Sequence, residues 1–429
     1  MSTILTNRTE APSLHIPDSV ALGTFREERL SNGVPVYSTQ HTEEDVVKLE
    51  LTFPAGRWYE PAAMMSRATC RLLTKGTSNY SSKELADRIE FYGASVDTSN
   101  GHDHTSVKIF TLGRYLGEVL PLVREMLLDA SFPEQEFEQF RQKQVQKLQV
   151  GLQNTDFVAN RKLHEVLFGA QHPYGYMATM ELIASLDRQQ LLDFSRKAYQ
   201  PANAMVFASG NTTPGTISLL EQYFGDGAAT LTASPQHALE TDPGTRFLEL
   251  NDRSVQSSVR IGGLTINKQH PDFPALNVAN TVLGGYFGSR LMSNIREEKG
   301  YTYGIYSMIR HHQHGSYFVI DTETGNEVCR QAVEETYKEM RLLATEPVDM
   351  EELDVVKNYM MGSLIRATDG SFNRIQVIRN MVLSGLDFDY FTRLAEAVRS
   401  STPETVMEMS RRYLQPELYK EIISGQPTD

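Results

Sequence analysis

Grouped histidines are the first residues whose types could hold a metal or move a proton. His311, His312 and His314 fall within four residues, between two segments with strand character. That placement predicts a hairpin turn, and its imidazoles are interpreted as a solvated tip rather than a metal site. His102 and His104 flank an aspartate near the start of another predicted strand, and no third ligand is placed beside them. These histidines therefore predict no metal centre.

The two cysteines, Cys70 and Cys329, limit the chemistry further. Two thiols exclude a disulfide scaffold and a four-cysteine zinc site, and they favour a reducing compartment. Arg67 and Arg71 flank Cys70, and such cationic neighbours would lower the pKa of its thiol and favour a thiolate nucleophile. No histidine base is positioned beside it, so a cysteine nucleophile is a minor alternative. The single tryptophan, Trp58, is interpreted as a core residue.

An internal repeat organises the elements that must position these residues. Residues 195–201 (SRKAYQP) are similar to residues 410–416 (SRRYLQP), at an offset of 215. The same offset relates Asp187 to Thr402, two N-cap residue types that each precede a helical pattern. Because this offset is about half of the 429 residues, the chain is predicted to contain two homologous domains.

The predicted domains span residues 20–225 and 246–429, joined by a linker at 226–245 rich in Gly, Ala, Thr and Pro. The net charge of −13 argues against nucleic acid and anionic membranes as main partners. No run approaches the ~18 apolar residues of a membrane span, and the first twenty residues lack the pattern of a secretory signal. These features predict a cytoplasmic protein with no nucleic-acid or membrane partner.

Within each half, strands and helices mix without regular βαβ alternation. Strands are predicted at residues 36–39, 46–53 and 106–111, and a capping box at Ser81 to Glu84 opens a helix that ends near Gly93. A long helix is predicted at 134–152, and strands at 302–309 and 316–321 flank the histidine turn. The predicted fold class is α+β, with two homologous domains that each pack helices on a largely antiparallel sheet.

Residues 55–77 carry a resemblance to a known family. A strand, Gly56, a helix and then Leu-x-Lys-Gly-Thr resemble the pitrilysin/insulinase family of zinc peptidases, which includes mitochondrial processing peptidase. The family helix carries an inverted H-x-x-E-H zinc motif. Aligned on Lys-Gly-Thr, its positions hold Arg67, Cys70 and Arg71, and Lys147 falls near the place of the third ligand, a glutamate on a later helix. Arginine has no lone pair to offer a metal, so the chain is predicted to bind no catalytic zinc.

The second half keeps another part of the family pattern. A glycine-rich stretch at 284–288 leads into residues 295–303, similar to the family's Leu-Arg-Glu-Lys-x-Gly-x-x-Tyr. The resemblance implies that Arg296 and Tyr303, at the family spacing of seven, hold the scissile carbonyl and the tetrahedral oxyanion. A guanidinium and a phenol O–H suit that task, because both stabilise developing negative charge. The structural alternative is that Arg296 pairs with Glu297 or Glu298 and that Tyr303 packs within its strand.

The resemblance covers essentially the whole chain and implies the processing-peptidase-like fold. It implies a zinc-free subunit of a heterodimeric zinc metallopeptidase, inactive alone and active with a homologous partner that carries H-x-x-E-H. In that interpretation the chain holds no cofactor, the partner holds the zinc, and a peptide substrate lies as an added strand on a sheet edge. The alternatives are a non-catalytic scaffold or peptide-binding subunit of this fold, and a metalloenzyme that uses other ligands.

Overall fold

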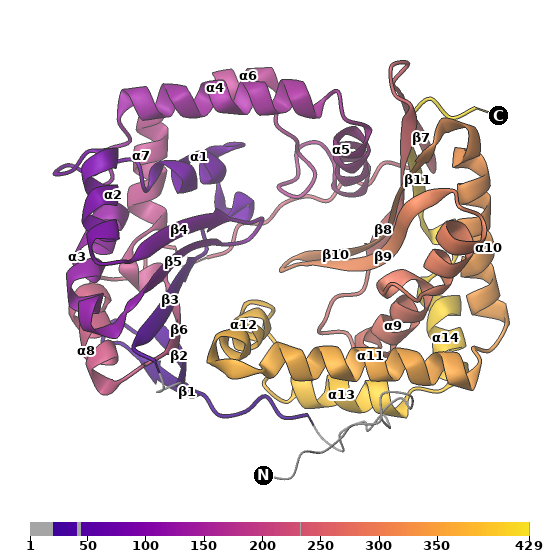
Figure 1. The fold of residues 1–429 in the computed structure, drawn as a ribbon. Coiled ribbons are helices and arrows are strands. Elements are labelled where there is room, and N and C mark those ends of the chain that lie inside the picture. Colours follow the sequence, from indigo (N-terminus) through magenta and orange to yellow (C-terminus); the bar gives the residue numbers. More distant parts are fainter. Residues whose placement is uncertain (1–19, 41–43, 232, 429) are drawn as a thin grey trace, which may run out of the picture.

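The computed structural model describes residues 20–40, 44–231 and 233–428. Two separate sheets lie at opposite sides of the molecule, each with helices packed against it (Figure 1). Two long helices connect the sides, α4 (Glu134–Gly151) along one margin and α11 (Met350–Thr368) along the other. This arrangement confirms the predicted α+β class with two sheets and packed helices.

The first sheet has six strands in the order β1-β2-β6-β3-β5-β4. Only β2 and β6 pair in parallel, and the other neighbours are antiparallel. The strand β4 is the outermost on one side, so its outer backbone groups have no strand partner among the described residues. The bounds are β1 Arg26–Arg29, β2 Pro35–Gln40, β3 Val46–Phe53, β4 Ser95–Asn100, β5 Thr105–Leu112 and β6 Met205–Gly210.

The second sheet has five strands in the order β7-β11-β8-β10-β9 and is built in the same way. Its single parallel pair is β7 with β11, and β9 is an outermost strand like β4. The predicted hairpin is confirmed, with β9 and β10 in antiparallel register around the histidine turn. The bounds are β7 Arg246–Leu250, β8 Gln256–Thr265, β9 Thr302–His312, β10 Gly315–Gly325 and β11 Lys420–Gly425.

The predicted helix starts are confirmed where the sequence offered a capping residue. Ser81 and Glu84 form a complete capping box, and Asp187 and Thr402 each accept a hydrogen bond from the backbone of the first turn. The remaining helices are α1 Met65–Leu72, α2 Ser82–Phe91, α3 Leu116–Leu128, α5 Thr155–Phe168, α6 Met180–Ala184, α7 Arg188–Ala198, α8 Pro214–Phe224, α9 Phe273–Asn280, α10 Cys329–Thr345, α12 Gly370–Leu383, α13 Tyr390–Ser400 and α14 Pro403–Tyr413.

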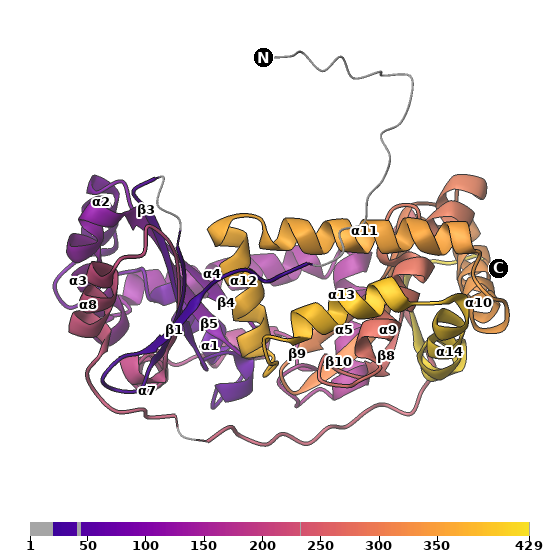
Figure 2. The same cartoon turned by 90° about the horizontal axis from the view of Figure 1, so that it is seen from below.

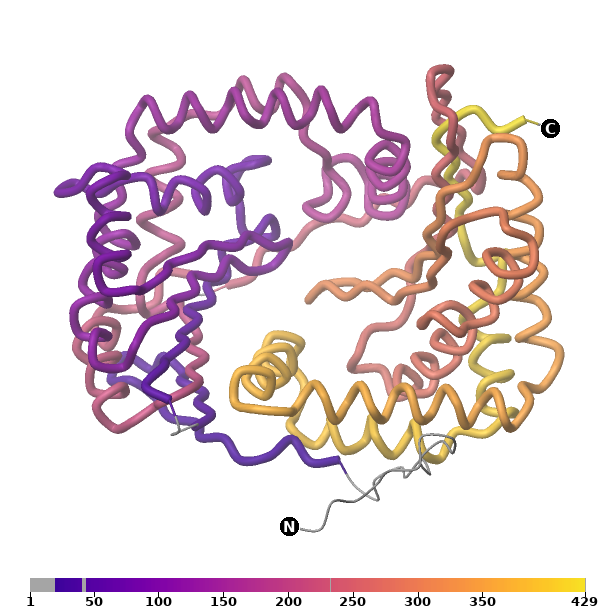
Figure 3. Tube along the Cα trace, in the orientation of Figure 1, coloured from indigo at the N-terminus to yellow at the C-terminus, as the bar shows by residue number. Residues whose placement is uncertain are grey.

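Elements of the first half recur in the second half at the offset seen in the sequence. The pairs α5 and α12, α7 and α14, and β6 and β11 have equal lengths, and the members of each pair start 215 residues apart. The chain trace in Figure 3 shows the two halves facing each other. The domain limits themselves, 20–225 and 246–429, stay a prediction, because α5 and α12 each pack on the sheet of the other half.

One helix from each half packs on the sheet of the other half. Helix α5 packs on β8 and β11, and α12 packs on β2 and β6. Gly262 in β8 permits the first contact, since a Cβ there would lie 3.0 Å from the Leu163 side chain of α5. In α12, Ile375 and Ile378 join a buried cluster with Tyr37 and Phe207 of the first sheet. The two halves therefore share hydrophobic cores and are fixed to each other.

Residues 226–245 contain no helix or strand in their described part, as the predicted linker requires. Figure 2 shows this segment running along the molecule from α8 to β7. Trp58 holds it in place, because its indole N–H donates to the Ser234 hydroxyl at 2.9 Å and to the Pro235 carbonyl at 3.1 Å. In the described ranges, no helix is both long enough and apolar enough to cross a membrane.

Candidate functional site

Helix α1 is the helix on which the zinc motif was sought, and it is buried on every side but one. Six of its eight residues are buried: Met65, Ser66, Ala68, Thr69, Cys70 and Leu72. The two others are Arg67, which is half-buried, and Arg71, which is exposed. Residues four apart lie on one face of a helix, so α1 presents two guanidinium groups from its single open face.

The start of α1 is held by Glu60. The backbone N–H groups of Met64 and Ser66 donate to its carboxylate at 3.2 and 2.8 Å, and the Tyr176 hydroxyl donates to it as well. A carboxylate at a helix start also complements the helix dipole. Burial raises the pKa of Glu60, while these hydrogen bonds act against that shift. Glu60 is thus committed to positioning α1.

The structure argues against the minor alternative of a reactive Cys70 thiolate. Its side chain is fully buried against the core, and this burial raises the pKa of the thiol despite the neighbouring Arg71. Cys329 is also free and buried. Lys147 lies on the exposed side of α4, whose buried polar residue is Gln144.

A third arginine lies near the open face of α1. Burial lowers the pKa of Arg67, and the positive charges of Arg57 and Arg71 lower it further. Arg57 stacks over the Tyr176 ring at 4.7 Å and donates to the Tyr176 carbonyl at 3.3 Å. Among the described residues, no carboxylate pairs with Arg67 or Arg71. Three guanidinium groups repel a metal cation, so this helix does not fit zinc.

The residues implied for oxyanion binding lie in the second half. Arg296 belongs to a π-helical segment, Met292–Glu298, where it stacks over Phe287 at 4.5 Å and pairs with Glu297 at 3.8 Å. Tyr303 is the second residue of β9 and is 93% exposed, so the alternative in which it packs within the strand is wrong. In the part of the chain described here, no interaction joins Arg296 to Tyr303. A cavity of about 400 Å³ lies beside Tyr303.

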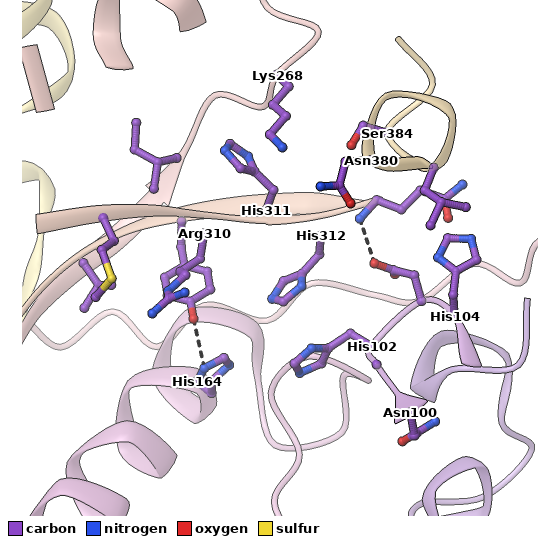
Figure 4. A pocket seen from close by; sticks show the side chains of 18 of the residues that line it. Asn100, His102, His104, His164, Lys268, Arg310, His311, His312, Asn380 and Ser384 are labelled. Carbon is purple, nitrogen blue, oxygen red and sulfur yellow. Dashed lines mark hydrogen bonds between the residues drawn. The ribbon is translucent and has the colours of Figure 1, made fainter. Parts of the chain in front are cut away.

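A larger cavity of about 770 Å³ lies where the β9–β10 hairpin meets the first half (Figure 4). His311 points to one side of the hairpin, towards Lys268, while His312 points to the other side, towards His102 and His164. The His102 and His312 rings are 4.3 Å apart. The expectation of a solvated tip is therefore wrong for His312, which packs against the first half, and for His311, whose ring lies against Phe273 of its own half at 4.8 Å.

The electrostatics of this junction favour neutral imidazoles. Burial lowers the pKa of His102 to about 2, of His312 to about 3 and of His164 to about 4. Neighbouring imidazoles and arginines add to the first two shifts, whereas for His164 the hydrogen bond with Tyr174 acts against the shift and only arginines add to it. His164 Nδ1 lies 3.0 Å from the Tyr174 carbonyl, which only accepts, so Nδ1 carries the proton and Nε2 accepts from the Tyr317 hydroxyl at 3.2 Å. Despite this crowding, the described residues contain no group of three or more His, Cys, Asp or Glu arranged to hold a metal.

Sequence reasoning missed one residue at each of two sites: Arg57 beside the open face of α1, and His164 at the junction of the β9–β10 hairpin with the first half. Arg57 was not singled out, although the neighbouring Gly56 marks a close approach: a Cβ there would lie 2.5 Å from the Asp103 backbone. His164, on a helix of the first half, meets a hairpin of the second half about 150 residues later, a pairing without a local signal. Trp58 is a core residue as expected, and it also stacks on His314 at 3.9 Å.

With the fold and these side chains in view, comparison with known proteins establishes the family. Residues 36–177 match the family model described as insulinase (peptidase family M16), and residues 185–360 match the model described as the peptidase M16 inactive domain. Together the two models span most of the chain. The chain belongs to peptidase family M16, the insulinase family, as the resemblance predicted.

Individual relatives are distant. An uncharacterized zinc protease of Bacillus subtilis, YmxG, is 25% identical over 307 residues, covering 70% of this chain and 73% of the relative. Subunit 1 of the mitochondrial cytochrome b-c1 complex of Caenorhabditis elegans is 24% identical over 322 residues, covering 68% of this chain and 65% of the relative. A crystal structure of a peptidase M16 inactive domain from Pseudomonas fluorescens superposes with a TM-score of 0.85 at 22% identity, covering 94% of this chain and 98% of the other, and supports the fold.

Proposed function

We propose that this chain is a zinc-free, peptide-binding subunit of a two-chain zinc metallopeptidase. Its partner is a homologous chain with an intact H-x-x-E-H helix, which holds the zinc. Arg296 and Tyr303 of this chain bind the peptide and stabilise the tetrahedral intermediate at the partner's site. The chain alone does not hydrolyse peptides. Both cysteines are free and buried, which suits the cytoplasmic location expected from the sequence.

The observation that carries the proposal is a contrast between two surfaces of the chain. The helix at the zinc-motif position shows Arg67 and Arg71 on its open face and buries Cys70, so its side chains repel a metal cation. Tyr303, by contrast, extends into solvent from an outermost strand. An exposed tyrosine with no packing role in this chain is explained if it acts on a ligand from outside the chain.

The surroundings of Tyr303 suit an extended peptide. The outer edge of β9 has no strand partner among the described residues, and its Ile305 N–H donates to the Met292 sulfur at 3.4 Å. An added strand would therefore pair with the part of this edge on the Tyr303 side of Ile305. The cavity beside it is lined by Tyr306 and Met308 of the same strand and by Glu323 of β10. A peptide on this edge would pass the Tyr303 hydroxyl, which can donate a hydrogen bond to a carbonyl or an oxyanion.

The test is to purify this chain and a zinc-bearing homologue of the same source, separately and mixed. We expect peptide hydrolysis only in the mixture. Arg296→Ala and Tyr303→Phe should each lower kcat of the mixture by about 10²–10³-fold, the usual effect of removing one oxyanion donor. Tyr223→Phe, on α8 and outside the lining of both cavities, is the control and should leave kcat unchanged. Hydrolysis by the zinc-bearing chain that is indifferent to this subunit would refute the proposal.

A non-catalytic scaffold is the second candidate, favoured by the similarity to a cytochrome b-c1 complex subunit. A scaffold of that kind forms a stable assembly without peptide turnover, and Tyr303→Phe leaves the assembly unaffected. Co-purification of the two chains followed by the same hydrolysis assay separates the candidates. A stable complex with no turnover above that of the zinc-bearing chain supports the scaffold.

A further inference from the structure

The open face of α1 carries two positive charges, Arg67 and Arg71, that have no ion pair among the described residues, while Arg57 beside them is attracted by the buried Glu60. Arg67 and Arg71 lie four residues apart on this face, and like charges at that spacing repel each other. Arg57 adds a third guanidinium from the turn before the helix, close enough to act on Arg67. Keeping three such groups together costs free energy unless an anion joins them.

The acids of the neighbourhood do not supply that anion. Glu60 is engaged by two backbone N–H groups and by the Tyr176 hydroxyl. The other described residues give Arg67 and Arg71 no ion pair and no hydrogen bond. Arg57 donates one N–H to the Tyr176 carbonyl, and a guanidinium has five N–H donors in all. Donors in this cluster thus remain available to a ligand.

The cluster also lies beside a place where a peptide can bind. Thr98 in the outermost strand β4 donates its hydroxyl to the Cys70 carbonyl of α1 at 3.0 Å. The two elements are therefore in direct contact, and the outer edge of β4 has no strand partner among the described residues. A peptide that adds a strand to β4 would run next to the face that carries Arg67 and Arg71.

We propose that Arg57, Arg67 and Arg71 form an anion site that binds a carboxylate of an acidic peptide. The helix position that holds a cation in zinc-bearing members of the family thus holds an anion in this chain. Bidentate pairing of a guanidinium with a carboxylate supplies both affinity and orientation. This inference rests on the proposed peptide-binding function and adds a second contact, the β4 edge, to the β9 edge beside Tyr303. It also adds the substrate class: peptides with glutamate or aspartate, or with a free carboxyl terminus, near the segment bound at β4.

The test measures binding of fluorescent peptides to the purified full-length chain by anisotropy. One peptide carries glutamates, a second has glutamine at those positions with an amidated end, and a third has glutamine with a free carboxyl terminus. We expect the glutamate peptide or the free-terminus peptide to bind at least about tenfold tighter than the neutral amide, as one or two charge-assisted hydrogen bonds would give. Which of these two binds tighter identifies the source of the carboxylate.

Variants then assign the preference to the arginines. Arg67→Gln and Arg71→Gln should abolish the preference and leave the affinity for the neutral amide unchanged, while Arg67→Lys should retain part of it. Arg88→Gln, an exposed arginine on the adjacent α2, is the matched control and should change neither affinity. Thermal melting of each variant checks that it is folded.

Two failures are distinguishable. Equal affinity for all three peptides, or a preference that survives in Arg67→Gln and Arg71→Gln, refutes the anion site and leaves the peptide-binding function standing. No binding of any peptide to the chain, together with no effect on the zinc-bearing partner, refutes the proposed function and the anion site with it.

Discussion

Acid should release the tip of the β9–β10 hairpin from the first half of the chain. At neutral pH the tip is held by stacking of His314 on Trp58 at 3.9 Å, by the His312 ring 4.4 Å from that of Tyr174, and by the Gln313 N–H, which donates to Asp103 at 2.9 Å. The Nε2 atom of His312 is buried without a hydrogen-bond partner among the described residues. Protonation would therefore place a charge where no acceptor receives it.

The sign of the effect follows from the pKa values. Burial lowers the pKa of His102 to about 2, of His312 to about 3 and of His164 to about 4, from 6.5 in water. The docked state then binds fewer protons than the released state, so docking is at full strength above about pH 6.5 and weakens as the pH falls towards 4. Asp103 acts in the opposite direction, because burial raises its pKa, whereas His172 and His314, whose pKa values burial also lowers, act in the same direction as the three rings.

The size of the effect can be worked from those shifts. At about pH 5, an imidazole whose pKa is about 6.5 after release binds a proton in the released state and stays neutral in the docked state. This protonation lowers the free energy of the released state by about 2 kcal/mol relative to the docked state. Three rings set an upper bound of about 6 kcal/mol, which they do not reach because neighbouring imidazoles do not protonate independently. The loss between about pH 7 and about pH 5 is therefore comparable with the whole stability of many domains.

The assay uses Trp58, the only tryptophan in the chain and 5% exposed at this junction. Its emission maximum and the urea midpoint that it reports should both shift between about pH 7 and about pH 5, the emission to longer wavelength. His312→Gln removes one titrating ring and should reduce the pH dependence of the urea midpoint by about a third. His270→Gln, outside the junction, is the control. A pH dependence that is absent, or equal in His312→Gln and the parent chain, would refute the reasoning.

Three further outcomes are expected. Arg379→Met removes the closest counter-ion of Glu50, which is 1% exposed and pairs with Arg379 Nε at 2.7 Å, and leaves Lys48 as a second positive charge nearby. Urea unfolding should therefore show a loss of about 1–3 kcal/mol that Glu50→Gln in the same chain largely restores. Gly56→Ala places a Cβ 2.5 Å from the Asp103 backbone and should cost about 1–3 kcal/mol in the same measurement. Gly362→Ala, in α11, is the control: its Cβ meets only ordinary contact and its backbone angle is not positive, so it should cause no loss. Elemental analysis of the purified chain should find well below one zinc per chain, and a stoichiometric amount would contradict the account of α1.

Local signals in the sequence predicted the elements with good accuracy. The N-caps at Asp187 and Thr402 and the capping box at Ser81 depend on bonds within one helical turn, so residue types alone reveal them. The strand at 46–53 and the hairpin turn follow from short-range patterning in the same way. The family likewise follows from the spacing of residues along the chain.

The errors came from contacts between distant segments. The histidine turn was expected in solvent, yet it docks on the opposite half, where residues about 140–210 positions away in the chain meet it. The minor alternative of a Cys70 thiolate rests on its arginine neighbours in the sequence, but α1 turns Arg71 outward and Cys70 into the core, where burial raises the pKa of the thiol. The sequence shows that Cys70 has arginine neighbours. It does not show whether burial, which raises the pKa of the thiol, outweighs their Coulomb attraction for the thiolate, which lowers it.

By itself, then, the sequence determined that the zinc-motif positions carry Arg67, Cys70 and Arg71, that Arg296 and Tyr303 keep their spacing, and that the chain repeats itself after 215 residues. Residue identity and spacing are one-dimensional facts, and they are enough to exclude zinc ligation by the two arginines. Only the tertiary structure decided that two arginines share the one open face of α1, that Arg57 joins them, and that the halves exchange α5 and α12. Those outcomes depend on which surfaces are buried together, and burial is a property of the whole packed chain.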